Sequence, residues 1–449
     1  MTTLSFPIAA EADSPAPASV LRLAIVISLA QALWMFLAVN FIAPHYSDLL
    51  TGDIAYFFGA AKHVLAGDMP YRDFAFEYPP GALLAMLAPA TLAGRSPDVT
   101  SYLWAMVFQN AVLAGAITVL LGRWSGLRSA ITFNAPLAIL AAFVPLRFDL
   151  LPALLTLLAV RYAIDRPARS GAILALGVCV KLYPAALLPI LLLPHVTARR
   201  WRGAGRLVCA FAGMMLLVLV PFAIVSHNHV FDFLTFHRVR GLQVESIGGA
   251  AILLASKLHL TSATVATSFF SSNVTGAWSS GAIVAMQLLM LGLLGLQFVS
   301  VILKGRPKST VAVIPRYSEG SRESRVVRIS RFLGVPRNDG GYRERGRSRD
   351  FQELALVAAT TLWIFIACNK VFSPQYVVWV LPLIALSKSR VAIVATVCVL
   401  TAAVFPFLYD SLKQIDWLPV LLVNARNGLV IAMIVYGLTT RPKNRIARV

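Results

Sequence analysis

The sequence predicts an all-α membrane protein, built as a polytopic bundle of transmembrane helices. Of its 449 residues, 58% are hydrophobic and only 13% are charged, whereas soluble domains carry about 25% charged residues. Long apolar stretches follow one another from about Leu21 to Thr439. Because one crossing needs about 20 apolar residues, we expect about 12 spans. This composition excludes a soluble enzyme, a disulfide scaffold and a disordered chain.

The positive charge follows the loops between the apolar stretches. The formal net charge is +20, which could indicate nucleic-acid binding, but basic residues confined to short loops are what the positive-inside rule produces. We therefore expect no nucleic-acid partner, a lipid bilayer as the surroundings, and both termini in the cytoplasm. The basic loops cover residues 122–129, 165–169, 195–206, 304–350, 387–390 and 439–449.

Acidic residues gather in the loops that this topology leaves outside, so we expect the working face to be extracytoplasmic. The expected organisation is a disordered cytoplasmic tail (1–19), a transmembrane module (20–303) with exterior loops at 43–100 and 226–280, an Arg-rich cytoplasmic insert (304–350), C-terminal transmembrane helices (351–438) and a basic tail (439–449). The four cysteines show no CxxC spacing, so neither a disulfide framework nor a zinc site is predicted.

Three segments do not fit a simple span. Residues 81–93 are too short to cross and are expected to form a re-entrant or interfacial helix. Residues 170–194 have cytoplasmic signals at both ends, so they are expected to form two short helices that meet at Lys181-Leu182-Tyr183-Pro184. Residues 248–260 are expected to form an interfacial helix. Broken helices at membrane depth occur where they line a polar cavity, so these places are candidates for function.

The first exterior loop begins with an amphipathic helix at the membrane surface. Asp53 falls in its first turn, where the helix dipole favours the ionised carboxylate. The predicted apolar face consists of Ile54, Phe57, Phe58, Ala61, Val64 and Leu65, and the opposite face of Asp53, Tyr56, Ala60 and His63.

Glu77 lies further along this loop, before Pro79-Pro80. Its carboxylate is a candidate ligand for a sugar hydroxyl or a metal ion. The alternative is a surface ion pair with Arg72. Both interpretations stay open at this point.

Cationic residues stand at the other outer-face irregularities. A charged side chain near a break within the membrane is costly and usually functional. Lys181 alternatively pairs with Asp149, and Arg147 is also close enough in sequence to Asp149 for mutual neutralisation. The candidate cations are Arg147, Lys181, Arg240 and Lys370.

The second exterior loop adds His237, Gln243 and Glu245, which are candidates for contact with a sugar, as is Tyr56 in the first loop. His237 is alternatively a surface histidine. The pair His227 and His229 has no carboxylate at ligand spacing, so no metal site is predicted there.

Several motifs, taken in order, resemble those of family 87 glycosyltransferases, which are polytopic enzymes of the GT-C superfamily that include polyprenyl-phosphate-mannose-dependent mannosyltransferases. The resemblance covers most of the chain except residues 304–350. It rests on Asp53-x-x-Tyr56, Gly67-x-x-Pro70-Tyr71, Glu77-Tyr78-Pro79-Pro80, Arg147-Phe148-Asp149, Lys181-Leu182-Tyr183-Pro184, His237-x-x-Arg240-Gly241-Leu242-Gln243-Val244-Glu245-Ser246, Asn369-Lys370-x-x-Ser373-Pro374-Gln375-Tyr376 and Arg426-Asn427.

This resemblance implies a bacterial plasma-membrane hexosyltransferase, with mannose as the sugar by family analogy. The donor would be a polyprenyl-phosphate-linked sugar and the acceptor a glycolipid or glycan. Asp53 would be the base that deprotonates the acceptor hydroxyl. Arg147, Lys181, Arg240 and Lys370 would stabilise the leaving phosphate. No cofactor is implied, and a divalent ion assists only some GT-C enzymes.

Three other functions remain open. A transporter or flippase of a lipid-linked sugar would also use broken helices and buried cations, although the sequence shows no internal repeat. A polymer ligase acting on a lipid-linked oligosaccharide would share the phosphate-binding cations without needing a base at Asp53. A non-catalytic scaffold is the third alternative.

Overall fold

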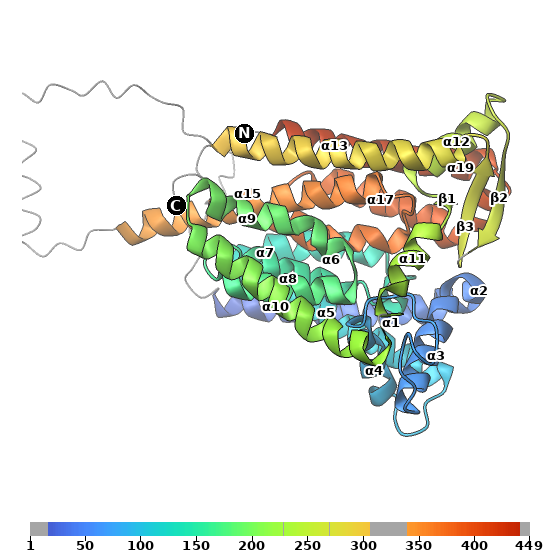
Figure 1. Cartoon of the computed structure of the whole chain (residues 1–449), viewed down its shortest axis with the longest axis horizontal. Coiled ribbons are helices and arrows are strands. Elements are labelled where there is room, and N and C mark those ends of the chain that lie inside the picture. The colour runs from blue at the N-terminus through green and yellow to red at the C-terminus, as the bar shows by residue number, and fades with distance from the viewer. Residues whose placement is uncertain (1–16, 228, 269, 306–338, 441–449) are drawn as a thin grey trace, which may run out of the picture.

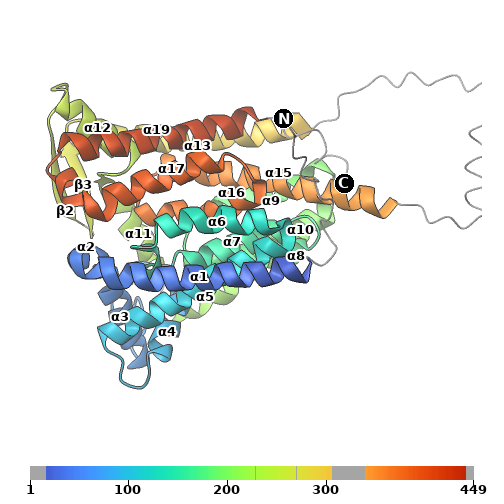
Figure 2. The ribbon, with the colours of Figure 1, turned by 180° about the vertical axis from the view of Figure 1, so that it is seen from behind.

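The computed structural model describes residues 17–227, 229–268, 270–305 and 339–440, and these residues are mostly helical. The long helices run side by side along one axis (Figures 1 and 2). Helix α1 (Ala18–Ile42) begins and α19 (Trp417–Thr439) ends at the same end of this bundle (Figure 2). Most of the expected N-terminal tail, Arg-rich insert and basic C-terminal tail lies outside the described residues, and α1 already begins at Ala18, within the range expected for the tail.

Six helices in the described part of the chain are long and apolar enough to cross a membrane. They are α1, α5 (Val99–Ser125), α10 (Trp201–Val225), α13 (Ser279–Gly305), α15 (Asp339–Ala367) and α19. Helix α15 therefore begins within the range expected for the insert. The multi-pass membrane character is confirmed, while the total of about 12 spans and the side on which the termini lie stay predictions.

Shorter apolar helices fill the space between the long ones. They are α4 (Ala82–Leu92), α6 (Leu127–Ile139), α7 (Leu150–Tyr162), α8 (Pro167–Val180), α9 (Leu188–Thr197), α12 (Ile247–Lys257), α16 (Leu381–Ser387) and α17 (Val391–Ala402). Helices α4 and α12 match the short helices expected at 81–93 and 248–260. Helices α8 and α9 confirm the two helices expected to meet at Lys181.

Proline-containing 3₁₀ turns reverse the chain between three pairs of helices. Proline lacks the backbone N–H that continues a helix. The turns are η2 (Val144–Leu146) between α6 and α7, η3 (Tyr183–Leu187) between α8 and α9, and η5 (Pro374–Trp379) between α15 and α16. Arg147 follows η2, Lys181 precedes η3 and Tyr376 lies in η5, and all three side chains reach the same region of the bundle.

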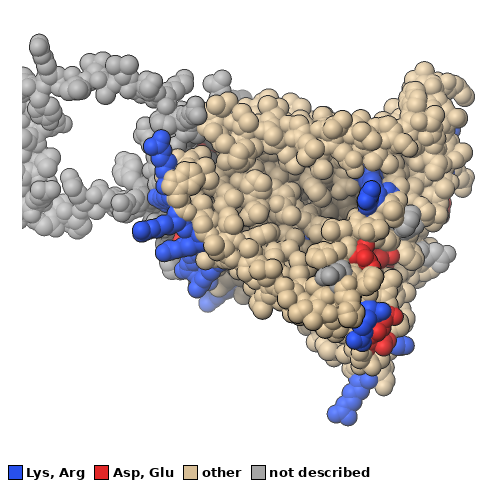
Figure 3. Space-filling view, in the orientation of Figure 1, with Lys and Arg blue, Asp and Glu red and all other residues tan. Residues whose placement is uncertain are grey.

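The two segments expected to form the exterior loops lie as two groups at one end of the bundle (Figure 1). The first exterior loop contains α2 (Ser47–Leu50), α3 (Gly52–Leu65) and α4, and the second contains α11 (Asp232–Val239), α12 and a small sheet; α18 (Tyr409–Lys413) precedes α19. Basic side chains gather at the opposite end (Figure 3), where the loop between α9 and α10 carries Arg199, Arg200, Arg202 and Arg206.

The expectation of an all-α fold is wrong in one place. A three-stranded antiparallel sheet, in the order β1-β3-β2, lies in the second exterior loop. Its strands are β1 (Leu242–Gln243), β2 (Ala263–Ser268) and β3 (Ser271–Gly276), and Ser268 pairs with Ser271 across a tight hairpin. Threonine and valine are frequent in the two longer strands, and such β-branched residues favour extended backbone.

Helix α3 forms where the amphipathic pattern predicts it, with Asp53 in its first turn. Ile54, Phe57 and Phe58 are buried, as expected. Two positions differ: Ala60 is buried and Leu65 is exposed. A methyl group on the polar face fits against the bundle, while Leu65 stands at the end of the helix where packing stops.

Helices α8 and α10 approach each other closely at Gly171. A Cβ atom placed there would lie 2.1 Å from the carbonyl oxygen of Leu207 and 3.1 Å from the backbone nitrogen of Phe211. Because backbone atoms cannot move aside as a flexible side chain can, only glycine allows this contact. Small residues at helix interfaces are a general feature of membrane bundles.

We predict that Gly171→Ala forces α8 and α10 apart and lowers the free energy of unfolding by about 1–3 kcal/mol, the usual cost of overpacking. Denaturation of the purified protein in detergent measures the change. The control is Gly213→Ala on α10, where a Cβ meets no atom within 4 Å. Equal stability of the two variants would contradict the close approach.

Candidate functional site

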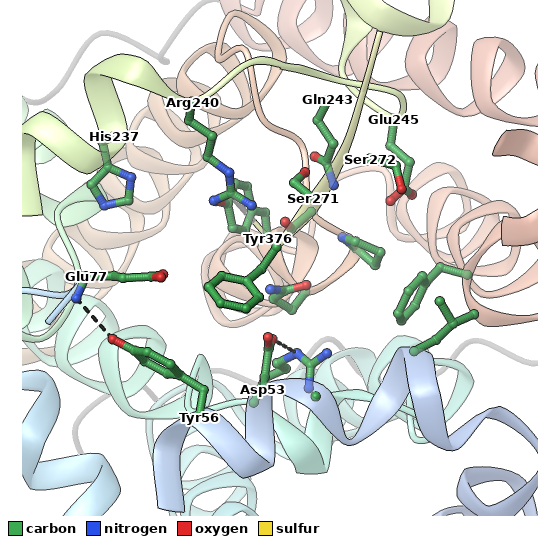
Figure 4. A pocket seen from close by; sticks show the side chains of 18 of the residues that line it. Asp53, Tyr56, Glu77, His237, Arg240, Gln243, Glu245, Ser271, Ser272 and Tyr376 are labelled. Atoms are coloured by element: carbon green, nitrogen blue, oxygen red, sulfur yellow. Dashed lines mark hydrogen bonds and ion pairs between the residues drawn. The ribbon is translucent and has the colours of Figure 1, made fainter. Parts of the chain in front are cut away.

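A cavity of about 410 Å³ opens between the exterior groups and the three proline turns. Its size is in the usual range for small-molecule sites. First-loop residues form one wall and second-loop residues face them from the other (Figure 4). The polar residues around it include Asp53, Tyr56, Glu77, Arg147, Lys181, His237, Arg240, Gln243, Glu245, Ser271, Ser272, Tyr376, Tyr409 and Lys413. All predicted site residues except Lys370 line this cavity.

Asp53 is held at the cavity wall by Arg147. The Nε atom of Arg147 lies 2.6 Å from Asp53 Oδ2, and its Nη1 donates to the carbonyl oxygens of Leu50 and Leu146. Arg147 is nearly buried, whereas the Asp53 side chain is 37% exposed. Arg147 thus fixes one carboxylate oxygen, and Oδ1 accepts no hydrogen bond from the described residues.

Asp149 joins the other two proline turns and has no ion pair with Arg147. Its Oδ1 accepts from Lys181 Nζ at 2.6 Å and from Trp379 Nε1 at 2.6 Å. The Trp379 ring stacks between those of Tyr183 (4.0 Å between centroids) and Tyr376 (3.9 Å). Of the two interpretations of Lys181, the pair with Asp149 is therefore present, and Lys181 also lines the cavity.

Glu77 and Tyr56 lie side by side on the first-loop wall. The backbone N–H of Glu77 donates to the Tyr56 hydroxyl oxygen at 3.1 Å. Arg72 pairs with Asp73 at 2.8 Å, so the alternative of an Arg72–Glu77 surface pair is wrong. Burial raises the pKa of Glu77 to about 7, helped by Asp53 and opposed by Arg240. The carboxyl group therefore titrates near neutral pH inside the cavity.

Arg240 and His237 face this wall from the second loop (Figure 4). Arg240 Nε is buried without a hydrogen-bond partner among the described residues. Burial lowers the pKa of His237 to about 4, and the charges of Arg240, Lys181 and Lys370 lower it further. His237 is therefore neutral at pH 7, and its ring is suited to hydrogen bonding. Arg240 is the cationic group whose donors are free for an anion.

Gln243 and Glu245 anchor the second loop to the rest of the bundle. The backbone N–H of Gln243 donates to the Lys370 carbonyl oxygen, and its Oε1 accepts from the Phe372 N–H at 2.8 Å. Glu245 is fully buried and pairs through Oε1 with Arg426 Nη1 at 3.1 Å. Burial raises the pKa of Glu245, and Glu245 Oε2 has no partner among the described residues.

Lys370 lies behind the cavity wall. Its ammonium group donates to the Arg238 carbonyl oxygen at 2.8 Å, and burial together with Arg240 lowers its pKa. Lys370 therefore supports the backbone before Arg240. Its predicted contact with a phosphate stays a prediction.

Among the described residues, no group of three or more His, Cys, Asp and Glu side chains is arranged to hold a metal ion. His229, considered above with His227, lies 3.0 Å from Asp232, and both side chains are exposed.

Sequence reasoning missed Phe270, Ser271 and Trp379. The β2–β3 hairpin that carries the first two has a detectable signal, two Ser/Thr/Val-rich runs joined by a short turn. Trp379 carries no such signal, because its indole reaches Asp149 only through the tertiary fold.

The family model for glycosyltransferase family 87 matches residues 76–314, more than half of the chain. The match includes Glu77, Arg147, Lys181, Arg240 and Glu245 but begins after Asp53. No curated protein and no solved structure matches the chain.

We predict that Glu77 makes stability fall as the pH rises. The pKa of Glu77 is about 7 in the folded protein and 4.5 ordinarily. Between these two pH values the folded protein therefore binds more protons than the unfolded chain. The free energy of unfolding therefore falls as the pH rises between these two pKa values, and it levels off above the higher one. Thermal unfolding in detergent between about pH 5 and pH 8 should show that the stability of Glu77→Gln rises relative to that of the native protein as the pH rises.

The control for this comparison is Asp73→Asn in the same loop, because the hydrogen bond from Arg72 lowers the pKa of Asp73 to about 2 and the carboxylate stays charged across this pH range. Its unfolding curve should stay parallel to that of the native protein. Parallel curves for Glu77→Gln would show that Glu77 titrates outside this range.

Proposed function

The chain belongs to glycosyltransferase family 87, and on that premise we propose that it transfers a hexose, mannose first among the candidates, from a polyprenyl-phosphate donor. The acceptor is a hydroxyl group of a lipid or glycan on the extracytoplasmic face of a bacterial plasma membrane. One observation carries the proposal: a half-exposed carboxylate and a guanidinium group with an unpartnered nitrogen, Asp53 and Arg240, line the same cavity at the exterior end.

Asp53 is the general base of this reaction. Arg147 holds Oδ2, so Oδ1 is the atom that accepts the proton of the acceptor hydroxyl. The hydroxyl oxygen then forms the new bond to the anomeric carbon as the bond from that carbon to the phosphate oxygen breaks. A base in this position contributes about 10²–10⁴-fold to the rate.

Arg240 binds the departing phosphate. Its guanidinium offers planar donors that match phosphate oxygens, and charge-assisted hydrogen bonds of this kind are strong. Lys181 adds a second positive charge, although Asp149 already neutralises part of it. Cations fixed before the reaction stabilise the negative charge that develops on the phosphate without reorganising during the step.

The charge distribution supports an exterior position of the cavity. It lies at the end of the bundle opposite the basic loop between α9 and α10 (Figures 1 and 3). Basic loops are retained in the cytoplasm, so the cavity opens on the other side.

We predict that Asp53→Asn slows transfer at least about a hundredfold, because the amide cannot accept the proton. Purified protein in lipid nanodiscs, supplied with radiolabelled polyprenyl-phosphate-mannose and then with other hexoses, measures transfer and donor consumption. The matched control is Asp68→Asn, a first-loop acid outside the cavity that pairs with His63 on the surface. It should retain native activity.

Equal turnover by Asp53→Asn and the native protein would exclude Asp53 as the base. Movement of the intact donor across the bilayer, without transfer of any hexose in the panel, would instead identify a flippase of lipid-linked sugar.

A further inference from the structure

The β2–β3 hairpin places an exposed aromatic ring at the cavity. Phe270 lines the cavity, yet it is 82% exposed, and it adopts a positive φ of 51°. Bulky residues rarely adopt such a backbone conformation. Its ring centroid lies 6.4 Å from that of Tyr56 on the opposite wall. The hairpin therefore holds a large apolar face where it packs against little protein.

Two buried oxygen atoms of residues that line the same cavity have no hydrogen-bond partner among the described residues. Ser271 Oγ follows directly on β3, in a residue that is 6% exposed, and Glu245 Oε2 belongs to a fully buried side chain. Neither atom has a hydrogen bond within the described part of the chain. Native proteins leave few buried polar atoms unsatisfied, and each one costs free energy. Ser271, Ser272 and Glu245 lie along the same wall, facing Asp53 (Figure 4).

The neighbouring polar groups already have hydrogen-bond partners within the protein. Ser272 is hydrogen-bonded to Tyr409, and Gln243 Oε1 accepts from the Phe372 backbone. Glu245 Oε1 is taken by Arg426. Ser271 Oγ and Glu245 Oε2 are thus the oxygen atoms on this wall that can still accept a hydrogen bond from the hydroxyl groups of a ligand.

We propose that Phe270, Ser271 and Glu245 form a binding subsite for a pyranose ring, whose apolar C–H face packs on Phe270 while its hydroxyl groups bond to Ser271 Oγ and Glu245 Oε2. A sugar combines one apolar face with several hydroxyl donors, which is the chemistry that this wall offers. A phosphate group would meet the Glu245 carboxyl, and a polyprenyl tail would leave both oxygens unsatisfied. The subsite deepens the proposed function, because it lies opposite Asp53 in the same cavity.

The pyranose has two possible sources, the sugar of the donor and a sugar of the acceptor. Steady-state kinetics separates them, because Phe270→Leu should raise KM for only the substrate whose ring it binds. We expect a rise of about tenfold, the value of an aromatic contact of about 1.4 kcal/mol, with little change in kcat. Phe270→Trp should restore the native KM. Ser271→Ala should raise the same KM by a few-fold, about the loss of one hydrogen bond.

A binding measurement keeps this test independent of turnover. Saturation-transfer NMR on the full chain in nanodiscs, with methyl hexopyranosides as probes, should show magnetisation passing to the ring protons of the sugar. The signal should be lost in Phe270→Leu and kept in Phe231→Leu, an exposed phenylalanine of the second loop outside the cavity.

The outcomes separate the two proposals. Native transfer with unchanged KM values in Phe270→Leu and an unchanged NMR signal would overturn the sugar subsite and leave the transferase intact. Phe270-dependent binding of hexopyranosides without any transfer would support the subsite and overturn the proposed reaction. A loss of activity that Phe270→Trp fails to restore, with unchanged sugar binding, would make Phe270 a folding residue and also overturn the subsite.

Discussion

The carboxylate of Asp149 is the interaction on which the site depends. It is 1% exposed and lies where three proline turns meet. A buried charge is costly unless it is paired and hydrogen-bonded. Lys181, which lies just before η3, and Trp379, which ends η5, supply both needs. The pairing thus fixes where the broken helices stop, and it sets the position of the adjacent Arg147.

The charged residues around the cavity fall into two groups, those held in ion pairs and those without such a partner. Arg147, held by backbone carbonyls, orients Asp53, and Arg426 holds Glu245. These ion pairs build the walls and neutralise much of the cavity's charge. Arg240 and Glu77 line the same cavity and have no such pairing among the described residues. This arrangement places an unpaired guanidinium group and a half-exposed carboxylate, those of Arg240 and Asp53, in one cavity.

The sequence predicted the helical bundle, the helix break at Lys181 and helix α3, because apolar length and amphipathic period are local properties. It also identified the charged residues of the cavity except Lys413, since charges near irregular membrane segments are costly and conspicuous. Their partners were harder to predict. Arg147 was considered with Asp149, two residues away, but it pairs with Asp53 across nearly a hundred positions. The sheet was missed because its strands are short and lie within a loop.

The same reasoning explains why Lys370 was grouped with the phosphate-binding cations. Its neighbours in sequence lie at the cavity, and only the fold shows that its ammonium group turns back to the carbonyl oxygen of Arg238. Position along the chain identified the region correctly, whereas the direction of one side chain depends on packing that no local pattern encodes.

The central claim is that transfer takes place in this cavity, with Arg240 receiving the phosphate. The most direct measurement is a cryo-EM structure of the full chain in nanodiscs with a polyprenyl phosphate bound. The account predicts phosphate density inside the cavity, within hydrogen-bonding reach of the Arg240 guanidinium group and facing Asp53. Phosphate density outside the cavity, with Arg240 making no contact to it, would contradict the account.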